Sequence, residues 1–176
     1  MKSRPLGRTG IQVSELGFGV WSVATTWWGV KDPTDGIWLL RRAAERGVTF
    51  FDTADVYGNG LGETMLADAF PVDQRQKLVI ATKFGYDFGA GQVRTGHGEL
   101  PQDWSPAAVR ASCEASLKRL GRDWIDVWQL HNPRMEAILS GELFETLEQL
   151  REAGKIRAAG IALGPDEGWG AEGLAA

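Results

Sequence analysis

The chain has 176 residues, 43% of them hydrophobic and 24% charged, a composition typical of a soluble globular domain with its own core. Its formal net charge of −4, and the lack of any apolar run of membrane-spanning length, argue against nucleic acid and membranes as partners. Cys113 is the single cysteine, so an internal disulfide is excluded and a reducing compartment, by default the cytoplasm, is expected.

The first part of the chain predicts a hairpin, a strand and a helix. Residues 4–13 place two short apolar segments on either side of a Gly-Arg-Thr-Gly turn, which is the pattern of a β-hairpin. Residues 14–20 predict the first core strand, in which Gly17 and Gly19 allow a close approach to the backbone. Residues 35–47 carry apolar side chains on one helical face and end in glycine, so a helix is expected there.

The rest of the chain repeats a strand followed by a helix. Short apolar runs predict strands at residues 48–52, 78–83, 125–130 and 155–161. Helical spacing and capping residues predict helices at residues 62–70, 106–120 and 141–153. Between them, residues 84–104 form a long glycine-rich loop, and loops of this length are usually functional or disordered.

The spacing of the predicted strands indicates the fold class. They begin at residues 16, 48, 78, 125 and 156, a recurrence of roughly 30 residues that the long loop lengthens once. Repeated βα units form a parallel sheet, which is either doubly wound or closed into a barrel. Because no GxGxxG or GxxxxGK[ST] motif follows any predicted strand, an α/β barrel is favoured over a nucleotide-binding doubly wound fold.

Polar side chains follow several of these strands. Asp52, Lys83 and His131 each stand at the end of a predicted strand, and Tyr57 lies five residues after Asp52. Each has an ordinary structural explanation when taken alone, such as a capping aspartate or a lysine whose ammonium reaches water. The carboxyl ends of parallel strands meet on one rim of a barrel, where active sites gather. Four such groups on one rim therefore predict a reaction.

The types of these four residues indicate acid catalysis on a carbonyl group. A phenol has a pKa near 10, which a nearby ammonium lowers, and a carboxylate can hold that ammonium in place. This combination makes a general acid, and a histidine can orient a carbonyl oxygen by donating a hydrogen bond. The sequence lacks the Ser-His-Asp order, CxxC pairs and HExxH, so we expect neither acyl transfer nor a metal site.

These residues lie in motifs that resemble the aldo-keto reductase family. The matching segments occur in the family's order over nearly all of the chain, and their combination is highly specific. They are Leu16-Gly17-Phe18-Gly19, residues 51–58 (Phe-Asp-Thr-Ala-Asp-Val-Tyr-Gly), Ala81-Thr82-Lys83-Phe84-Gly85, Leu130-His131-Asn132-Pro133 and residues 154–161 (Gly-Lys-Ile-Arg-Ala-Ala-Gly-Ile).

The resemblance implies a (β/α)8 barrel of the TIM type whose bottom is plugged by the N-terminal hairpin. It implies reduction of an aldehyde or ketone by hydride transfer from NAD(P)H, with NADP(H) expected over NAD(H). Tyr57 would be the proton donor, Lys83 and Asp52 its tuning pair, and His131 the group that orients the carbonyl.

The resemblance also implies where the cofactor and the substrate bind. Asp52 and the backbone near Gly19, Val20 and Trp21 would lie beside the nicotinamide ribose. Trp27 and Trp28, together with Tyr57, His131 and the loop at 84–104, would line the substrate pocket. The sequence departs from the family after the fifth strand, where Ala162 and Leu163 replace a Ser-Asn pair that holds the nicotinamide carboxamide. Arg94, His97 and Arg157 are candidates for a substitute phosphate site.

The length of the chain leads to a further expectation. A (β/α)8 barrel takes about 250 residues, whereas residues 1–176 contain about five predicted βα units. We therefore expect a single aldo-keto reductase domain, incomplete at its C-terminus, that self-associates through open sheet edges. An alternative function stays open, in which this partial barrel is inactive and acts as an interaction module or needs a partner chain to complete the site.

Overall fold

The computed structural model describes residues 1–25, 29–89, 100–164 and 166–176. The strands are β1 (Ser3–Pro5), β2 (Gln12–Ser14), β3 (Gly17–Gly19), β4 (Phe50–Asp52), β5 (Val79–Phe84), β6 (Ile125–His131) and β7 (Ile156–Ala162). The helices are α1 (Trp21–Ala24), α2 (Pro33–Glu45), α3 (Leu61–Ala69), α4 (Val72–Arg75), α5 (Pro106–Leu120), α6 (Met135–Ile138), α7 (Gly141–Glu152) and α8 (Asp166–Ala175).

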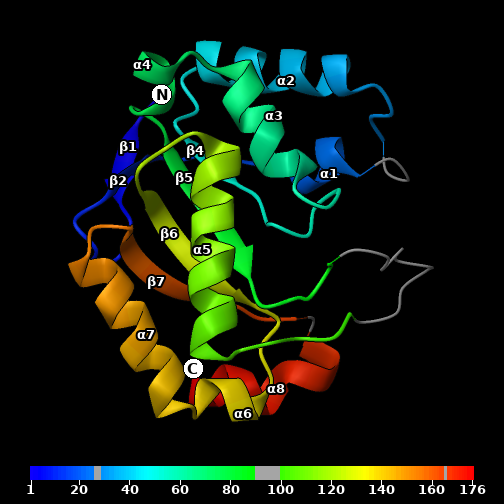
Figure 1. Cartoon of the computed structure of the whole chain (residues 1–176). Coiled ribbons are helices and arrows are strands. Elements are labelled where there is room, and N and C mark those ends of the chain that lie inside the picture. The colour runs from blue at the N-terminus through cyan, green and yellow to red at the C-terminus, as the bar shows by residue number, and fades with distance from the viewer. Residues whose placement is uncertain (26–28, 90–99, 165) are drawn as a thin grey trace.

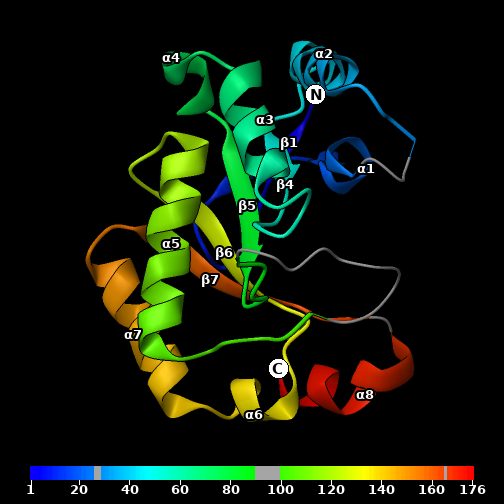
Figure 2. The same cartoon turned by 45° about the vertical axis from the view of Figure 1, so that its right-hand side comes forward.

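The central element is a parallel sheet whose five strands follow chain order, β3-β4-β5-β6-β7. Each strand pairs in parallel with the next, and every crossover contains at least one helix. Figures 1 and 2 show this sheet with α5 and α7 packed along one side of it. The predicted α/β fold of the TIM-barrel type, with about five βα units and an N-terminal hairpin, is confirmed.

Capping residues fix where the long helices begin. Ser105 accepts a hydrogen bond from the Ala108 backbone N–H at 3.3 Å, and Ser140 accepts one from that of Leu143 at 3.3 Å, as their positions before helical patterns predict. Helix α2 begins two residues earlier than expected, because Asp32 accepts from the Thr34 N–H at 2.9 Å and Pro33 takes the first helical position.

The core is divided by the sheet into two layers. The larger layer lies between the sheet and the helices and contains Phe51, Ile80, Phe84, Trp128 and Leu130. The smaller layer lies on the opposite face, where two hairpin side chains pack against the sheet; it contains Ile11, Val13, Val79, Ala81 and Val127. The hairpin thus covers the lower part of this second face and leaves the carboxyl ends of the strands to other residues.

Several local predictions need correction. Residues 14–20 do not form one strand, since Ser14 ends β2, Gly17–Gly19 forms β3 and Val20 precedes α1. The side chain of Ser14 instead accepts from the Thr49 N–H at 2.9 Å, which joins the hairpin to the segment before β4. Helices α1, α4 and α6 have four residues each, too few to produce a helical period in the sequence, and the sequence did not predict them.

In the described part of the chain, no helix combines the length and the apolar character that a membrane crossing requires.

The first testable prediction concerns the sheet edges. Among the described residues, β3 and β7 are the edge strands, each paired on one side. An apolar hollow lined by Phe144, Ala159 and Leu163 accompanies β7. Since unpaired strand edges beside apolar surface are templates for a further strand, we propose that β7 pairs with a second copy of this chain. Light scattering coupled to size-exclusion chromatography should show self-association.

A charge on this edge should weaken that pairing. Ala159→Lys places an ammonium on the exposed side of β7 and should shift the apparent mass toward the monomer. Gln76→Lys adds the same charge at an exposed position after α4 and should leave the mass distribution as in the parent chain. A parent chain that elutes as a single monomeric species would contradict the proposal.

Candidate active site

Strand alternation brings the predicted polar residues to one face of the sheet. Successive side chains of a strand point to opposite faces. On β5, Val79 and Ala81 belong to the layer covered by the hairpin, so Lys83 points to the same face at the carboxyl end of the strand. On β6, Val127 belongs to this layer, and His131 shares its face at the carboxyl end. Asp52 ends β4 on the same side.

The ammonium of Lys83 is the centre of the group. Its Nζ donates to Asp52 Oδ1 at 2.5 Å, to the carbonyl oxygen of Thr53 at 2.7 Å and to Tyr57 Oη at 3.4 Å. The lysine is 6% exposed, so its charge is largely removed from water. The side chain of Asp52 is 38% exposed and keeps contact with solvent. Lys83 therefore contacts both the carboxylate of Asp52 and the phenol of Tyr57, which the sequence predicted to share one site.

Tyr57 is held by the loop between β4 and α3. Its carbonyl oxygen accepts from the Gly62 N–H at 3.1 Å, and its N–H donates to the carbonyl of Ala54 at 3.2 Å. Gly58 has a φ of 59°, and a Cβ there would lie 2.4 Å from the carbonyl oxygen of Ala24, so this turn requires glycine. The half-buried phenol ring stands edge-on to the His131 ring, with centroids 5.7 Å apart.

The structure brings all four predicted catalytic residues together. It also adds residues that sequence reasoning missed. Gln129 Nε2 donates to the second carboxylate oxygen of Asp52 at 3.3 Å. The ring of Tyr86 also stands edge-on to that of His131, with centroids 5.0 Å apart, which is closer than the Tyr57 ring. Alternation along β6 could have identified Gln129, two positions before His131, whereas no periodicity marks a loop residue such as Tyr86.

The predicted cofactor residues lie at the carboxyl ends of β3 and β4. Gly19 pairs in register with Asp52, and a Cβ at Gly19 would meet nothing within 4 Å, so the backbone there is open to a ligand. The half-buried Trp21 opens α1 next to this point. Val20 differs, since its side chain is fully buried in the core and its N–H donates to the carbonyl of Asp52 at 2.8 Å. Gly19, Trp21 and Asp52 thus form an accessible surface at the carboxyl ends of β3 and β4.

The predicted substrate wall and the candidate phosphate ligands have different outcomes. The proposed substrate wall of Trp27 and Trp28 lies outside the described residues, as do Arg94 and His97. Arg157 is placed away from the site, because its Nη1 pairs with Asp126 Oδ1 at 2.8 Å near the amino-terminal ends of β6 and β7. Arg157 as a phosphate ligand at the rim is therefore wrong. Cys113 is a core thiol, and burial raises its pKa to about 12.

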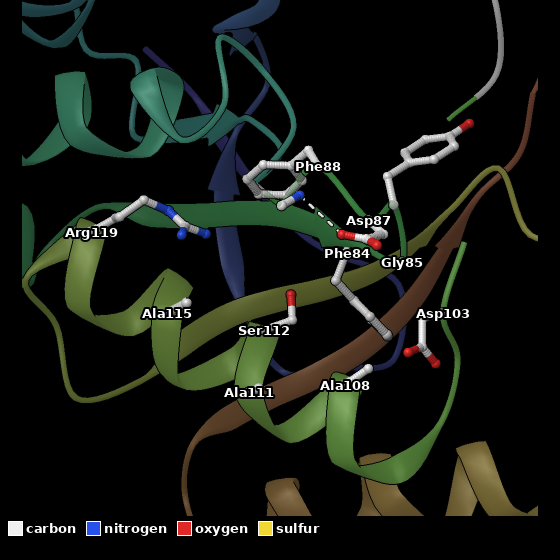
Figure 3. A pocket seen from close by; sticks show the side chains of 12 residues that line it. Phe84, Gly85, Asp87, Phe88, Asp103, Ala108, Ala111, Ser112, Ala115 and Arg119 are labelled. Carbon is white, nitrogen blue, oxygen red and sulfur yellow. Dashed lines mark hydrogen bonds between the residues drawn. The ribbon is translucent and has the colours of Figure 1, made fainter. Parts of the chain in front are cut away.

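A cavity of about 480 Å³ lies against α5 and contains none of the four predicted catalytic residues. Figure 3 shows Arg119 at one end, Asp103 at the other and Ser112 between them. The cavity belongs to the helix-covered side of β5, because Phe84 lines it and packs in the larger core layer. It is therefore separate from the Lys83 site, which lies on the other face of the sheet.

A buried acidic pair lies beneath this cavity. Glu63 is fully buried and accepts from Arg119 Nε at 2.6 Å and from Thr82 Oγ1 at 2.7 Å. Asp55 is 1% exposed and accepts from Ser112 Oγ at 3.3 Å. Burial, reinforced by repulsion from Glu63, raises the pKa of Asp55 to about 8, so this carboxyl carries a proton at neutral pH.

Comparison with known proteins gives a consistent result. The model of the Aldo/keto reductase family matches residues 15–166. "Probable aldo-keto reductase 1" of Glycine max is 35% identical over 157 residues, which are 89% of this chain and 43% of that protein. "Aldo-keto reductase YhdN" of Bacillus subtilis (strain 168) is 34% identical over 163 residues, or 92% of this chain and 47% of that protein.

Solved structures show the same relationship. The aldo-keto reductase AKR11C1 from Bacillus halodurans, in its holo form, superposes with a TM-score of 0.81 at 35% identity, covering 93% of this chain and 50% of that one. The glycerol dehydrogenase AKR11B4 from Gluconobacter oxydans gives a TM-score of 0.77 at 28% identity, covering 99% of this chain and 52% of that one. The chain spans about half the length of these proteins.

The second testable prediction follows from Asp55. An unfolded chain releases this proton near pH 4, whereas the folded chain keeps it until about pH 8. Between these values the folded state binds one more proton than the unfolded state. The contribution of Asp55 to the free energy of unfolding therefore falls by about 1.4 kcal/mol per pH unit as pH rises, and it levels off above pH 8.

Replacing the carboxyl should remove this slope. Asp55→Asn keeps the shape of the side chain without a titrating proton, and its stability should exceed that of the parent increasingly from pH 5 to pH 8. Urea unfolding followed by tryptophan fluorescence at fixed protein concentration measures the difference. Asp68→Asn changes an exposed carboxyl on the same helix, α3, and serves as the control. Parallel curves for Asp55→Asn and the parent chain would show that Asp55 is ionised in the fold.

Proposed function

Since the chain belongs to the aldo/keto reductase family, we propose that it reduces the carbonyl group of an aldehyde or ketone to an alcohol with a nicotinamide cofactor. The observation that carries this proposal is the contact of one buried ammonium, that of Lys83, with both Asp52 and Tyr57. A phenol can serve as a general acid when an ammonium, itself held by a carboxylate, stabilises the phenolate that forms.

The proton donor in this proposal is Tyr57. Reduction of a carbonyl requires a hydride at carbon and a proton at oxygen, and the phenol supplies the proton. The phenolate that remains is stabilised by the ammonium of Lys83 at 3.4 Å. Asp52 holds that ammonium in place through its contact at 2.5 Å. Because Lys83 is almost fully buried, these charges interact with little screening by water.

His131 has the second role in the proposal. Its ring lies beside the phenol ring of Tyr57, with centroids 5.7 Å apart, so both can reach one carbonyl oxygen. An imidazole N–H that donates to this oxygen fixes the carbonyl relative to the phenol. The histidine is 8% exposed, which limits competition from water for the same hydrogen bond.

Gly19, Trp21 and Asp52 are the residues that we propose to hold the nicotinamide end of the cofactor. The open backbone at Gly19 and the solvent-accessible part of Asp52 fit a ribose, whose hydroxyl groups a carboxylate can bind. When bound, the nicotinamide supplies the hydride. The similar protein from Bacillus halodurans is described in a holo form, which supports a cofactor here. We propose NADP(H) over NAD(H) by resemblance to the family.

The proposed function can be tested by two measurements on the purified chain. Quenching of tryptophan fluorescence reports NADPH binding, and loss of NADPH absorbance with a panel of aldehydes and ketones reports turnover. Binding and alcohol formation are expected. The absence of both NADPH binding and turnover would contradict the proposal. That result would favour the alternative, a partial barrel that acts as an interaction module or needs a partner chain.

The third testable prediction concerns the proton donor. Tyr57→Phe removes the hydroxyl and should lower kcat by roughly 10²- to 10⁴-fold, the usual contribution of general acid catalysis. NADPH affinity should change little, because the phenol acts mainly in the transition state. Trp38→Phe alters an exposed aromatic residue on α2, and should keep the parent rate. If Tyr57→Phe retained most of the rate, Tyr57 would not be the proton donor.

The fourth testable prediction separates the two members of the ion pair. Lys83→Met should abolish turnover, since the phenolate loses its counter-charge. Asp52→Asn should lower both rate and stability, because the buried ammonium loses its carboxylate. Since Asp52 is partly exposed, we expect the free energy of unfolding to fall by about 1–3 kcal/mol, less than for a fully buried pair. For a chain of this size, this lowers Tm by about 2–4 °C per kcal/mol.

The controls are Lys77→Met and Asp68→Asn, which remove the same groups at exposed positions. Both should keep the parent Tm and rate. An Asp52→Asn variant that matched the parent in Tm and in kcat would show that the contact with Lys83 has no energetic role.

A further inference from the structure

The loop after β5 has an ordered stem. The Asp87 N–H donates to the carbonyl of Pro101 at 2.8 Å, and the Asp103 N–H donates to that of Gly85 at 2.9 Å. Between these bonds, Tyr86 and Gln102 form an antiparallel bridge. Two short segments from opposite ends of the long loop are thus fixed to each other. We refer to residues 85–87 and 101–103 as the stem.

Hydrogen bonds join the stem to His131 and Asn132 at the end of β6. Gln102 Nε2 donates to the carbonyl oxygens of both His131 and Asn132, at 2.9 and 3.1 Å. From the other strand of the stem, Tyr86 Oη accepts from Asn132 Nδ2 at 2.9 Å. The Tyr86 ring also stands edge-on to the His131 ring, at an interplanar angle of 68° and a centroid distance of 5.0 Å. Both stem residues therefore contact the end of β6.

The backbone at this point is in an uncommon conformation that needs support. Asn132 has a φ of 50°, in the left-handed region that non-glycine residues seldom adopt, although asparagine is among the most tolerant. Its N–H donates to the carbonyl of Ala162 at 2.7 Å, so β7 holds it from the other side. The turn that follows His131 is thus fixed between β7 and the stem, and the stem contacts both the backbone and the ring of His131.

We infer that Tyr86 and Gln102 are positioning residues that set the orientation of His131 toward the carbonyl group. This inference rests on the proposed function of His131 and extends it to the loop, a segment far from β6 in the sequence. If the stem only closed the loop, apolar packing would suffice. Instead, the amide of Gln102 is directed at the carbonyl groups of His131, the last residue of β6, and of Asn132. The phenol of Tyr86 is directed at the Asn132 side chain.

The position of the stem also indicates how the loop can affect the reaction. Gly85, Tyr86, Asp87 and Asp103 form part of the wall of the cavity in Figure 3, and the ring of Tyr86 also contacts that of His131. The stem therefore separates that cavity from His131. A displacement of the stem would change the hydrogen bonds at the end of β6 directly. Asp52, Lys83 and Tyr57 are held instead by β4, by β5 and by the loop between β4 and α3, respectively.

Two substitutions test the inference with little change in shape. Gln102→Leu removes the amide that donates to the two carbonyls, and Tyr86→Phe removes the oxygen that accepts from Asn132 while keeping the ring. Gln76→Leu, at an exposed glutamine, is the matched control. In the steady state, both test variants should lose kcat by roughly 10- to 100-fold, as misplacement of a catalytic group does, with a smaller change in KM.

A second readout does not depend on turnover. The sequence contains two histidines, His97 and His131, so imidazole NMR signals are few and His131→Gln assigns them. Gln102→Leu and Tyr86→Phe should shift or broaden the ring signals of His131, and Gln76→Leu should leave them unchanged. Unchanged His131 signals in both test variants would overturn the inference.

The two readouts also separate this inference from the proposed function. If Tyr57→Phe kept its rate while the ring signals moved, the reaction assignment would fail and the contact between stem and histidine would stand. If the ring signals stayed and Tyr57→Phe lost activity, the positioning role would fail and the reaction assignment would stand.

Discussion

The structure depends on how one buried ammonium is compensated. Moving a charge out of water costs several kcal/mol, and it is tolerated only where other groups replace the lost hydrogen bonds. Lys83 meets this requirement with a carboxylate from β4, a backbone carbonyl just after β4 and a phenol from the following loop. These partners come from a short stretch around Asp52, so β4, the loop after it and β5 must keep one relative arrangement for the ammonium to retain all three contacts.

Strand β5, which carries Lys83, also contacts the helices through its other face. Thr82, next to Lys83, points away from the site and donates to the fully buried Glu63, which Arg119 of α5 also contacts. Neighbouring residues of β5 thus belong to two polar groups on opposite faces of the sheet. One group supports the proposed chemistry and the other joins α3 to α5. A shift of β5 would disturb both groups, so the packing of the outer helices also restrains the position of the ammonium.

Much of this arrangement follows from simple sequence rules. Alternation along β4, β5 and β6 places Asp52, Lys83 and His131 on one face, and capping at Ser105 and Ser140 sets two helix starts. The rules failed where local pattern is too short or absent. The strand predicted over seven residues, 14–20, is only three residues long in the structure, where it forms β3. Ser14 does not belong to it, because its side chain accepts a hydrogen bond from Thr49. Tyr86 and Gln102 could not be found, since their partner lies some 30 to 45 residues away and only tertiary structure brings them together.

The composition of the site has a practical consequence. The sequence has two tyrosines, and both of them flank His131, with ring centroids 5.7 and 5.0 Å from it. Every phenol in the molecule therefore lies within one small region at the carboxyl ends of the strands. Tyrosine-selective spectroscopy, or a reagent that modifies phenols, reports on that region without contribution from the rest of the chain. The protein thus carries its own phenol label at its candidate active site, and no probe has to be introduced.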